Sequence, residues 1–369
     1  MTKILYIGHY GKDGGGYSQA ATDYILAMDA VGLDVIPRPF RLNSENNPVH
    51  PRIAELEKKD PREAEVVIQH TLPHHMKYNG NFKNIGLFAS ETSNFLGSTW
   101  SSRLKQMDEL WVPNYQMTLA LRDSRVNKPT KIIPHAVDVS AFNQSYEPLP
   151  IDEIRDNFAF YFVGELNVRK NLIALLKAFH TEFRRNEPVS LVLKVNKSGC
   201  TEEEVTNQTL QICQNVKEGL KLKRAKREII IAQRLTEYQM GQLHSSCHCL
   251  VAPSYGEACH IPSLYALGFG NVPLCTDIHG GFEHITGANG FRVKSEVTPV
   301  FAMGENTFSD LYLGTENWNS ISIPELKWAM RRIYEDTELR RATSKQGMQD
   351  VYKYSHKAIG EKIKEALCL

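Results

Sequence analysis

The stretch Cys249-Leu-Val-Ala-Pro-Ser-Tyr-Gly-Glu-Ala-Cys-His-Ile-Pro-Ser-Leu-Tyr-Ala-Leu-Gly268 runs from an apolar segment through a polar loop into a second apolar segment. The apolar run Cys249–Ala252 predicts a short buried strand. Pro262 suits the first turn of the helix that follows, and Gly268 or Gly270 can end that helix. The stretch therefore predicts one strand, loop and helix of a parallel α/β sheet, with the loop at the sheet's carboxyl edge.

The rest of the chain repeats this alternation of short β-branched runs and longer amphipathic segments. Such alternation predicts parallel, doubly wound sheets. A polar, proline-containing segment at 143–156 interrupts the pattern, which then starts again. The expected strands are 3–7, 33–36, 65–69, 84–88, 109–112 and 131–133 before the break, and 158–163, 190–195, 228–232, 249–252, 272–275 and 290–293 after it, with helices at 18–31, 116–122 and 172–184.

The interruption divides the chain into two expected Rossmann-like domains. We expect an N-terminal domain at 1–155, a C-terminal domain at 156–345, and a C-terminal helix within 346–369 that returns to the first domain. Two such domains would place their carboxyl edges face to face across a cleft, which is where sheets of this kind bind ligands.

Composition limits the classes of function. The chain has 369 residues, is 42% hydrophobic and carries a formal net charge of +1, which suits a two-domain globular protein without a strongly basic footprint for nucleic acid. No apolar signal region follows Met1, and no apolar run approaches the roughly 18 residues of a membrane span. We therefore expect a cytoplasmic protein.

Cysteine and histidine patterns do not predict a metal centre. The seven cysteines are odd in number and scattered, and Cys247 and Cys249 would point to opposite faces of a strand, so we expect free thiols. His70, His74 and His75 follow an expected strand and could contact a substrate. Because acids are missing beside His74 and His75, we expect no metal there.

Three glycines, Gly14 to Gly16, stand between the first strand and its helix. Glycine lets a backbone approach a phosphate or a sugar closely, although a plain surface loop remains an alternative. The Gly-x-Gly-x-x-Gly fingerprint is absent, and the second strand ends near Pro39 without a ribose-binding acid. These features count against a nicotinamide-dependent oxidoreductase.

Charged residues gather at the expected carboxyl edge of the second sheet. Lys170 lies at a strand-to-helix turn, where it can place a charge on a phosphate. Free N–H groups near 259–263, together with the helix dipole, form an anion site. Since an anion site would not favour a carboxylate pointed at it, we expect Glu257 to accept hydrogen bonds from sugar hydroxyls beside the phosphates.

With these motifs in this order, the chain resembles the retaining GT-B glycosyltransferases of family 4, which use nucleotide-sugar donors. The resemblance covers almost the whole chain. It rests on Gly14-Gly-Gly16, Trp111-Val-Pro-Asn114, Ile133-Pro-His-Ala-Val-Asp138, Val163-Gly-x5-Lys-Asn171, Ala252-Pro-Ser-Tyr-Gly-Glu257 and Asp277-Ile-His-Gly-Gly-Phe-Glu283.

The resemblance implies a GT-B fold, a nucleotide-sugar donor on the second domain and an acceptor on the first. It also implies transfer without a metal or a further cofactor, because protein charges stabilise the leaving diphosphate. Retention in this family is explained by front-face attack, in which a leaving phosphate oxygen takes the acceptor's proton. The candidate catalytic residues are Lys170, Glu257 and His135, the donor-binding residues are Gly15, Gly16, Arg169, Cys259, His260, Ile261, Pro262, Tyr265, Arg234, Leu235 and Glu283, and the acceptor-side residues are Glu91, Thr92 and Tyr17.

Two positions depart from the family pattern. Tyr265 stands where the family commonly has a second glutamate that grips the ribose, and a tyrosine cannot accept two hydrogen bonds in that way. Glu165 stands where the family usually has an arginine on the diphosphate. We expect Glu165 to face away from the phosphates and Arg169 to take that place.

Other readings of the sequence stay open. The departures fit a nucleotide-sugar-binding protein that has lost transfer activity. The acceptor is a glycan, a lipid or a small molecule, or else nucleic acid if the basic run at 221–227 binds a polyanion. The plainer reading of that run is the solvated face of an amphipathic helix, and the plainer reading of His135 is a packed structural histidine.

Overall fold

The computed structural model describes residues 2–11, 15–40, 48–278, 280–301 and 311–369. Gly14, and the His279 position of the motif at 277–283, lie outside the described residues. The chain divides into two compact units, each assembled from more than one segment. Unit 1 comprises Met1–Val139, Thr307–Glu316 and Tyr352–Leu369, and unit 2 comprises Ser140–Asn306 and Asn317–Val351.

Unit 1 is built on a six-stranded parallel sheet with the strand order β2-β1-β3-β4-β5-β6. Strands β3 and β5 are buried along their whole length, as expected of a parallel sheet covered on both faces. The strands are β1 Lys3–Gly8, β2 Asp34–Pro39, β3 Val66–His70, β4 Lys83–Leu87, β5 Glu109–Val112 and β6 Thr130–Ile132.

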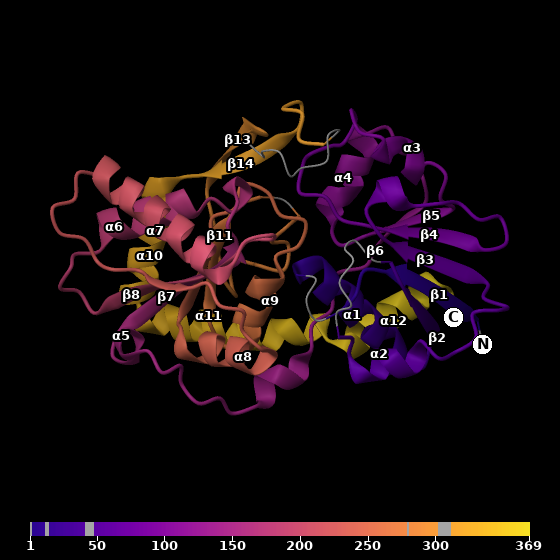
Figure 1. Cartoon of the computed structure of the whole chain (residues 1–369), viewed down its shortest axis with the longest axis horizontal. Coiled ribbons are helices and arrows are strands. Elements are labelled where there is room, and N and C mark those ends of the chain that lie inside the picture. Colours follow the sequence, from indigo (N-terminus) through magenta and orange to yellow (C-terminus); the bar gives the residue numbers. More distant parts are fainter. Residues whose placement is uncertain (1, 12–14, 41–47, 279, 302–310) are drawn as a thin grey trace. The chain divides into compact units, whose positions relative to one another are not determined.

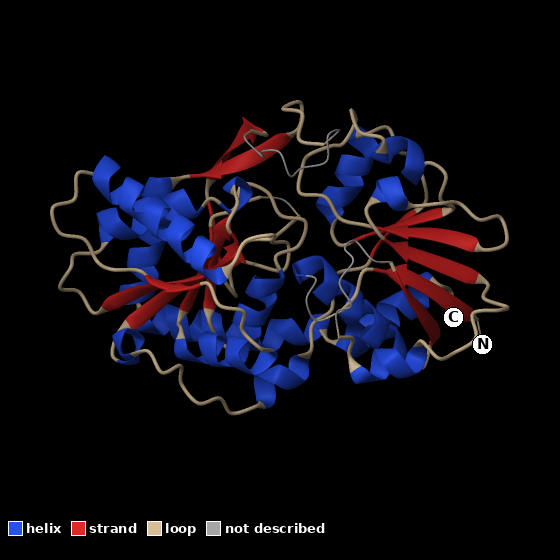
Figure 2. Ribbon diagram, viewed as in Figure 1, coloured by secondary structure: helices blue, strands red, loops and turns tan. Residues whose placement is uncertain are grey.

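Helices cover both faces of this sheet (Figure 2). The C-terminal helix α12 lies along α1, although the two are far apart in the sequence (Figure 1). A hydrogen-bonded pair joins them, because Oδ1 of the buried Asp23 lies 2.8 Å from Nε2 of the partly exposed His356. The helices of unit 1 are α1 Gly15–Ala30, α2 Pro51–Leu56, α3 Trp100–Leu104, α4 Tyr115–Asp123 and α12 His356–Ala366, with a 3-10 turn η1 at Pro73–His75.

Unit 2 is built on a second six-stranded parallel sheet with the order β12-β11-β10-β7-β8-β9 and a separate antiparallel pair, β13 and β14. The strands of the sheet are β7 Phe158–Glu165, β8 Val189–Asn196, β9 Ile229–Ile231, β10 Cys249–Ala252, β11 Val272–Thr276 and β12 Phe291–Val293, and the pair is β13 Ser295–Pro299 with β14 Asn317–Ile321.

Two apolar cores sandwich the second sheet. Leu191, Leu193 and Val195 of β8 face one core, and Val192 of the same strand faces the other. Capping residues fix the starts of the covering helices; Thr201, for example, forms a capping box with Glu204. The helices are α5 Asp152–Arg155, α6 Leu172–Glu182, α7 Glu202–Gly219, α8 Glu237–Ser246, α9 Ile261–Gly268, α10 Ile323–Glu335 and α11 Thr337–Asp350, with a 3-10 turn η3 at Val168–Lys170. Two further 3-10 turns, η2 Val139–Asn143 and η4 Val351–Tyr354, include residues of both units.

The predicted fold class is confirmed, since each expected strand is present in one of two parallel sheets. The antiparallel pair β13–β14 was not predicted. The prediction of a helix for the basic run at 221–227 is wrong, because α7 ends at Gly219 and the run is a loop. Lys226 of this loop is held by the backbone, donating to the carbonyl oxygens of Glu187 and Val189. No helix among the described residues is long and apolar enough to cross a membrane.

Candidate functional site

The turn between β7 and α6 presents two cations at the carboxyl edge of the second sheet. Asn167 caps the 3-10 turn η3 by accepting a hydrogen bond from Lys170 N at 3.1 Å. Asn171 has a positive φ of 51° and donates to Pro253 O at 3.1 Å. An asparagine tolerates this left-handed conformation, which turns the chain into α6 directly after Arg169 and Lys170.

The loop after β10 is held against that same turn by two hydrogen bonds, one between backbone groups and one from the Arg169 side chain. Tyr255 N donates to Arg169 O at 2.8 Å, and Arg169 Nη1 donates to Gly256 O at 2.8 Å. The antiparallel pair supports the loop as well, because Asn319 N of β14 donates to Tyr255 O at 2.8 Å. These contacts hold Glu257 beside the two cations.

Glu257, Lys170 and Arg169 form a buried charge cluster. Lys170 Nζ lies 2.6 Å from Glu257 Oε1, and Arg169 Nη1 lies 3.0 Å from Glu257 Oε2. The carboxylate side chain is 5% exposed, and those of the two cations are 12% and 13% exposed. One carboxylate between two cations leaves a net charge of +1, so the cluster can attract an anion.

The charge on Glu257 is maintained by its neighbours. Burial by itself would raise the pKa of Glu257, but the charges of Lys170 and Arg169 outweigh it and hold this pKa well below its ordinary value of 4.5. An ionised carboxylate orients the two cations and cannot act as a general acid near neutral pH. The sequence did not predict this pairing with Lys170 and Arg169, which a buried carboxylate needs. That Glu257 accepts hydrogen bonds from sugar hydroxyls stays a prediction.

The N-terminus of α9 lies next to this cluster. Pro262 occupies the first turn, as predicted, and Gly270, with a φ of +76°, follows the helix end. His260 precedes Ile261, donates its backbone N–H to Gly281 O at 2.9 Å, and has a buried Nδ1 without a hydrogen-bond partner among the described residues. Burial lowers the pKa of His260 to about 3, so its ring is neutral at pH 7.

Two further buried polar atoms near this edge lack partners. Ser254 Oγ follows β10 and Thr276 Oγ1 ends β11, and neither has a hydrogen-bond partner within the described parts of the chain. Buried polar groups are nearly always satisfied in native proteins. Together with His260 Nδ1, these atoms suit a polar ligand at the carboxyl edge.

The loop after β11 packs tightly on the charge cluster. A Cβ on Gly281 would lie 2.3 Å from Glu257 Cβ, so this position requires glycine. Glu283 is exposed two residues further on. Cys259 is partly buried, and burial together with the charge of Glu257 raises the pKa of its thiol to about 12. Cys259 is therefore a neutral thiol and not a nucleophile at physiological pH.

The two departures from the family pattern take defined positions. Glu165 Oε2 accepts from Asn167 Nδ2 at 3.1 Å, and Glu165 Oε1 accepts from Ser198 N at 3.5 Å. The ring of Tyr265 packs against Phe142 and His244, with centroids 5.8 Å and 6.1 Å away. Glu165 is thus engaged by local hydrogen bonds and Tyr265 by aromatic packing.

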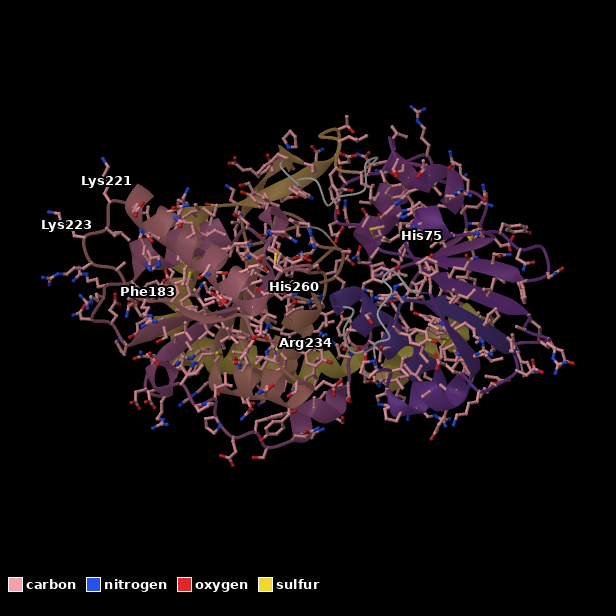
Figure 3. The ribbon with its side chains drawn as sticks, in the orientation of Figure 1. His75, Phe183, Lys221, Lys223, Arg234 and His260 are labelled. Atoms are coloured by element: carbon pink, nitrogen blue, oxygen red, sulfur yellow. The ribbon has the colours of Figure 1, made fainter. Side chains whose placement is uncertain are left out.

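Arg234 and Leu235 follow β9 at the same edge of the sheet, and Figure 3 shows Arg234 on the side of unit 2 where His260 lies. The backbone N–H of Arg234 donates to Glu202 Oε1 at 2.9 Å, and Leu235 packs on an apolar core. Figure 3 places Lys221 and Lys223 at the opposite end of the unit, away from these candidate site residues.

Sequence reasoning missed Lys194, a buried lysine in β8 at this edge. Its signal was available, since a single charged residue interrupts the apolar strand 190–195. Ser254 and Thr276 were also missed, and for these no sequence signal exists because small hydroxyl side chains are common in any strand or loop.

The other candidate residues belong to unit 1 and gather around aromatic rings. Tyr17 packs on His70 with centroids 4.6 Å apart, and Tyr24 lies 5.5 Å from His70 and 5.4 Å from His135. Tyr24 Oη donates to Ile133 O, so His135 Nδ1, 3.0 Å from Tyr24 Oη, is the donor in their hydrogen bond. This arrangement leaves His135 Nε2 as the ring's acceptor nitrogen.

His135 is neutral in this environment, because burial lowers its pKa to about 4. His70 is also buried, and Tyr6 Oη lies 2.6 Å from its Nδ1. The structure therefore places His70 beneath Tyr17, as part of the packing rather than as a surface for a substrate. A neutral His135 can accept a proton or a hydrogen bond through Nε2.

The remaining unit 1 candidates lie at the carboxyl edge of the first sheet. Gly15 and Gly16 are exposed at the start of α1, and Gly15 has a φ of +68°. Glu91 Oε2 accepts from Tyr312 Oη at 2.9 Å, and Thr92 Oγ1 donates to Asn94 O at 2.8 Å. Glu91 and Thr92 follow β4, so they share this edge with Tyr17 and His135.

Metal-ligating side chains do not cluster in the part of the chain that the structure describes, where no three histidine, cysteine or acidic residues are grouped to hold an ion. His74 Nδ1 accepts from Trp100 Nε1 at 3.1 Å. Cys247 and Cys249 are free and buried, and burial raises the pKa of both thiols.

Comparisons with known proteins show the fold. No protein-family model and no curated protein matches the sequence. Anabaena Alr3699/HepE in complex with UDP-glucose is similar at 15% identity and a TM-score of 0.68, with both chains covered in full. Sucrose-phosphate synthase from Thermosynechococcus elongatus has the same identity and TM-score, over 100% of this chain and 98% of its own.

A third structure, the trehalose-6-phosphate protein from E. coli bound with UDP-2-fluoro glucose, is similar at 11% identity and a TM-score of 0.71, with 99% of each chain covered. These matches cover nearly the full length of both chains, and this chain has two parallel sheets. Together these observations define the fold class. This protein has the GT-B fold, an α/β fold with two parallel sheets and interleaved helices.

Proposed function

We propose that this protein is a retaining glycosyltransferase that moves a sugar from a nucleoside diphosphate sugar to an acceptor without a metal ion. The observation that carries the proposal is the buried cluster of Lys170, Arg169 and Glu257 beside the N-terminus of α9. The similar structures with UDP-glucose and UDP-2-fluoro glucose support it, as does the resemblance to glycosyltransferases of family 4.

The cluster suits a leaving diphosphate. When the bond between the sugar C1 and the phosphate oxygen breaks, negative charge develops on that oxygen. Lys170 and Arg169 carry positive charge, and Glu257 fixes their positions before the reaction begins. Prearranged charge of this kind stabilises a transition state because it does not have to reorganise.

Retention follows if the acceptor attacks from the same face that the diphosphate leaves. A new bond then joins C1 to the acceptor oxygen, and the acceptor's proton passes to the departing phosphate oxygen. This route needs no protein base. His135, neutral and with Nε2 as its acceptor nitrogen, is proposed to accept a hydrogen bond from a hydroxyl group of a substrate.

A second candidate function is nucleotide-sugar binding without transfer. The observation that favours it is the packing of Tyr265 against aromatic rings at the position where the family commonly has a ribose-binding glutamate. Binding of a nucleotide sugar with no release of its diphosphate, across a broad panel of acceptors, would favour this candidate.

The test measures nucleoside diphosphate released from nucleotide sugars, with EDTA present and acceptors supplied as a mixed panel. We expect Lys170→Met to lower the rate about 100- to 1000-fold, the usual effect of removing one group that stabilises the transition-state charge. The control is Lys177→Met, which removes an exposed lysine from the same helix region. Equal rates in Lys170→Met and wild type would contradict the site. Proton NMR of the product's anomeric proton tests retention, which requires the same anomeric configuration as in the donor.

A further inference from the structure

Lys194 is a buried cation of β8, the strand between β7 and the edge strand β9 of the second sheet. It pairs in register with Val163 of β7 and Ile231 of β9, near the carboxyl ends of these strands. The residue is 7% exposed. Burying an ammonium group is costly unless its hydrogen-bond donors are satisfied, so a lysine at this position needs an explanation.

The hydrogen-bonding capacity of Lys194 is poorly satisfied by the described residues. Its Nζ donates to Val195 O at 3.3 Å, which is longer than a good hydrogen bond, and it forms no ion pair with any described residue. An ammonium group has three donors, so two remain for a ligand. Burial lowers the pKa of Lys194; the charge of Glu202 opposes this effect and that of Arg234 adds to it.

The strand order places Lys194 beside the proposed diphosphate site. Lys170 follows β7 and Glu257 follows β10, and β8 is the next strand beyond β7. Neighbouring strands lie about 4.8 Å apart. A nucleotide whose phosphates meet Lys170 can therefore extend along the edge over β8, towards Arg234 after β9.

The chemistry of the Lys194 ammonium group indicates which part of the nucleotide its two unused N–H donors contact. Lysine donates and never accepts, so it fits a group that only accepts, such as a ring carbonyl oxygen. Uracil and guanine carry such oxygens, whose two lone pairs can accept from both free donors, whereas adenine offers only ring nitrogens with one lone pair each. The backbone N–H of Arg234, which could have read the base instead, already donates to Glu202.

We infer that Lys194 donates a hydrogen bond to a carbonyl oxygen of the donor's base and so selects uracil or guanine nucleotides over adenine nucleotides. This inference rests on the proposed function, since it requires a nucleotide at the edge of the second sheet. Base selection is then a property of a β8 side chain, and not of Arg234 and Leu235 in the loop after β9.

Calorimetric titration with UDP, GDP and ADP tests the inference on the full-length protein. In wild type, ADP should bind at least tenfold more weakly than the better of UDP and GDP. Lys194→Met should weaken that better ligand about 10- to 100-fold, as expected for a lost hydrogen bond from a charged donor, and change ADP less than threefold. Lys177→Met serves as the control and should leave all three dissociation constants unchanged.

The outcomes separate this inference from the proposed function. If wild type binds none of the three nucleotides, the proposed function itself fails. Wild type could bind the nucleotides while Lys194→Met keeps the same affinities, or weakens the binding of all three equally, as the loss of a phosphate contact would. In either case Lys194 does not select the base, and the proposed function stands. Thermal unfolding of Lys194→Met checks its fold, and the wild-type preference against ADP tests the inference without any variant.

Discussion

At the scale of single residues, the site depends on one buried carboxylate that holds two cations. The sequence indicated Lys170 and Glu257 separately, as a turn lysine and a loop acid. Their pairing was not predictable, because they lie 87 positions apart in the chain and meet only where β7 and β10 are neighbours. Local patterns can find candidate residues, but the contact between them is a product of the sheet topology.

Replacing this carboxylate should lower stability. Glu257→Gln leaves Lys170 and Arg169 partly buried without a counter-charge, so we expect the free energy of unfolding to fall by about 3 kcal/mol. Urea unfolding measures this change. The control is Glu296→Gln, an exposed glutamate of β13, which should change stability by less than about 0.5 kcal/mol. Equal effects of the two substitutions would show that the charge cluster does not support the fold.

Two buried histidines should make stability depend on pH. The folded pKa is about 4 for His135 and about 3 for His260, against an ordinary value of 6.5. Between these values the unfolded chain binds more protons than the folded one, so stability is full above pH 6.5 and falls as the pH drops. The slope is up to about 1.4 kcal/mol per pH unit for each histidine.

Unfolding free energies at pH 7 and pH 5 measure this slope. His260→Gln should show a smaller loss between the two pH values than wild type does, because one buried histidine fewer takes up a proton on unfolding. Glu257 does not contribute in this range, since its pKa rises only to the ordinary 4.5 on unfolding. An unchanged difference between pH 7 and pH 5 in His260→Gln would show that its ring is not held neutral by burial.

At the scale of elements, buried strands were predictable and the exposed pair was not. β10, for example, is a continuous apolar run because both faces of a parallel sheet are covered. β13 and β14 are half exposed, rich in polar residues and separated by residues 300–316. The missed pair matters for the site, because Asn319 of β14 supports the loop that carries Glu257.

The packing of α12 on α1 provides a prediction at this scale. A Cβ on Gly360 would lie 2.2 Å from the carbonyl oxygen of Ala27, so Gly360→Ala must separate the two helices. We expect a loss of about 1–3 kcal/mol, measured by chemical unfolding. Gly219→Ala, at the end of α7, is the control because a Cβ there has no neighbour within 4 Å. A destabilisation of the same size in both variants would contradict close packing at Gly360.

At the scale of the whole molecule, the alternation of strands and helices was enough to predict two doubly wound sheets, and the full-length structural matches confirm the GT-B fold. The identity of the ligand, by contrast, could not be predicted from this alternation. In our inference, base selection depends on Lys194, a side chain that only the folded sheet brings to the carboxyl edge, and the acceptor leaves no motif in the sequence. The proposal therefore rests most heavily on whether unit 2 holds a nucleotide.

Thermal unfolding of the full-length protein in EDTA, with UDP, GDP, ADP and their common sugars, tests this claim most directly. Ligand at about a hundred times its dissociation constant should stabilise the folded protein by roughly 2.7 kcal/mol. We expect a rise in Tm with at least one nucleotide in wild type and in Lys177→Met, and a loss of that rise in Lys170→Met. No rise with any nucleotide in wild type, or an equal rise in Lys170→Met, would contradict the account.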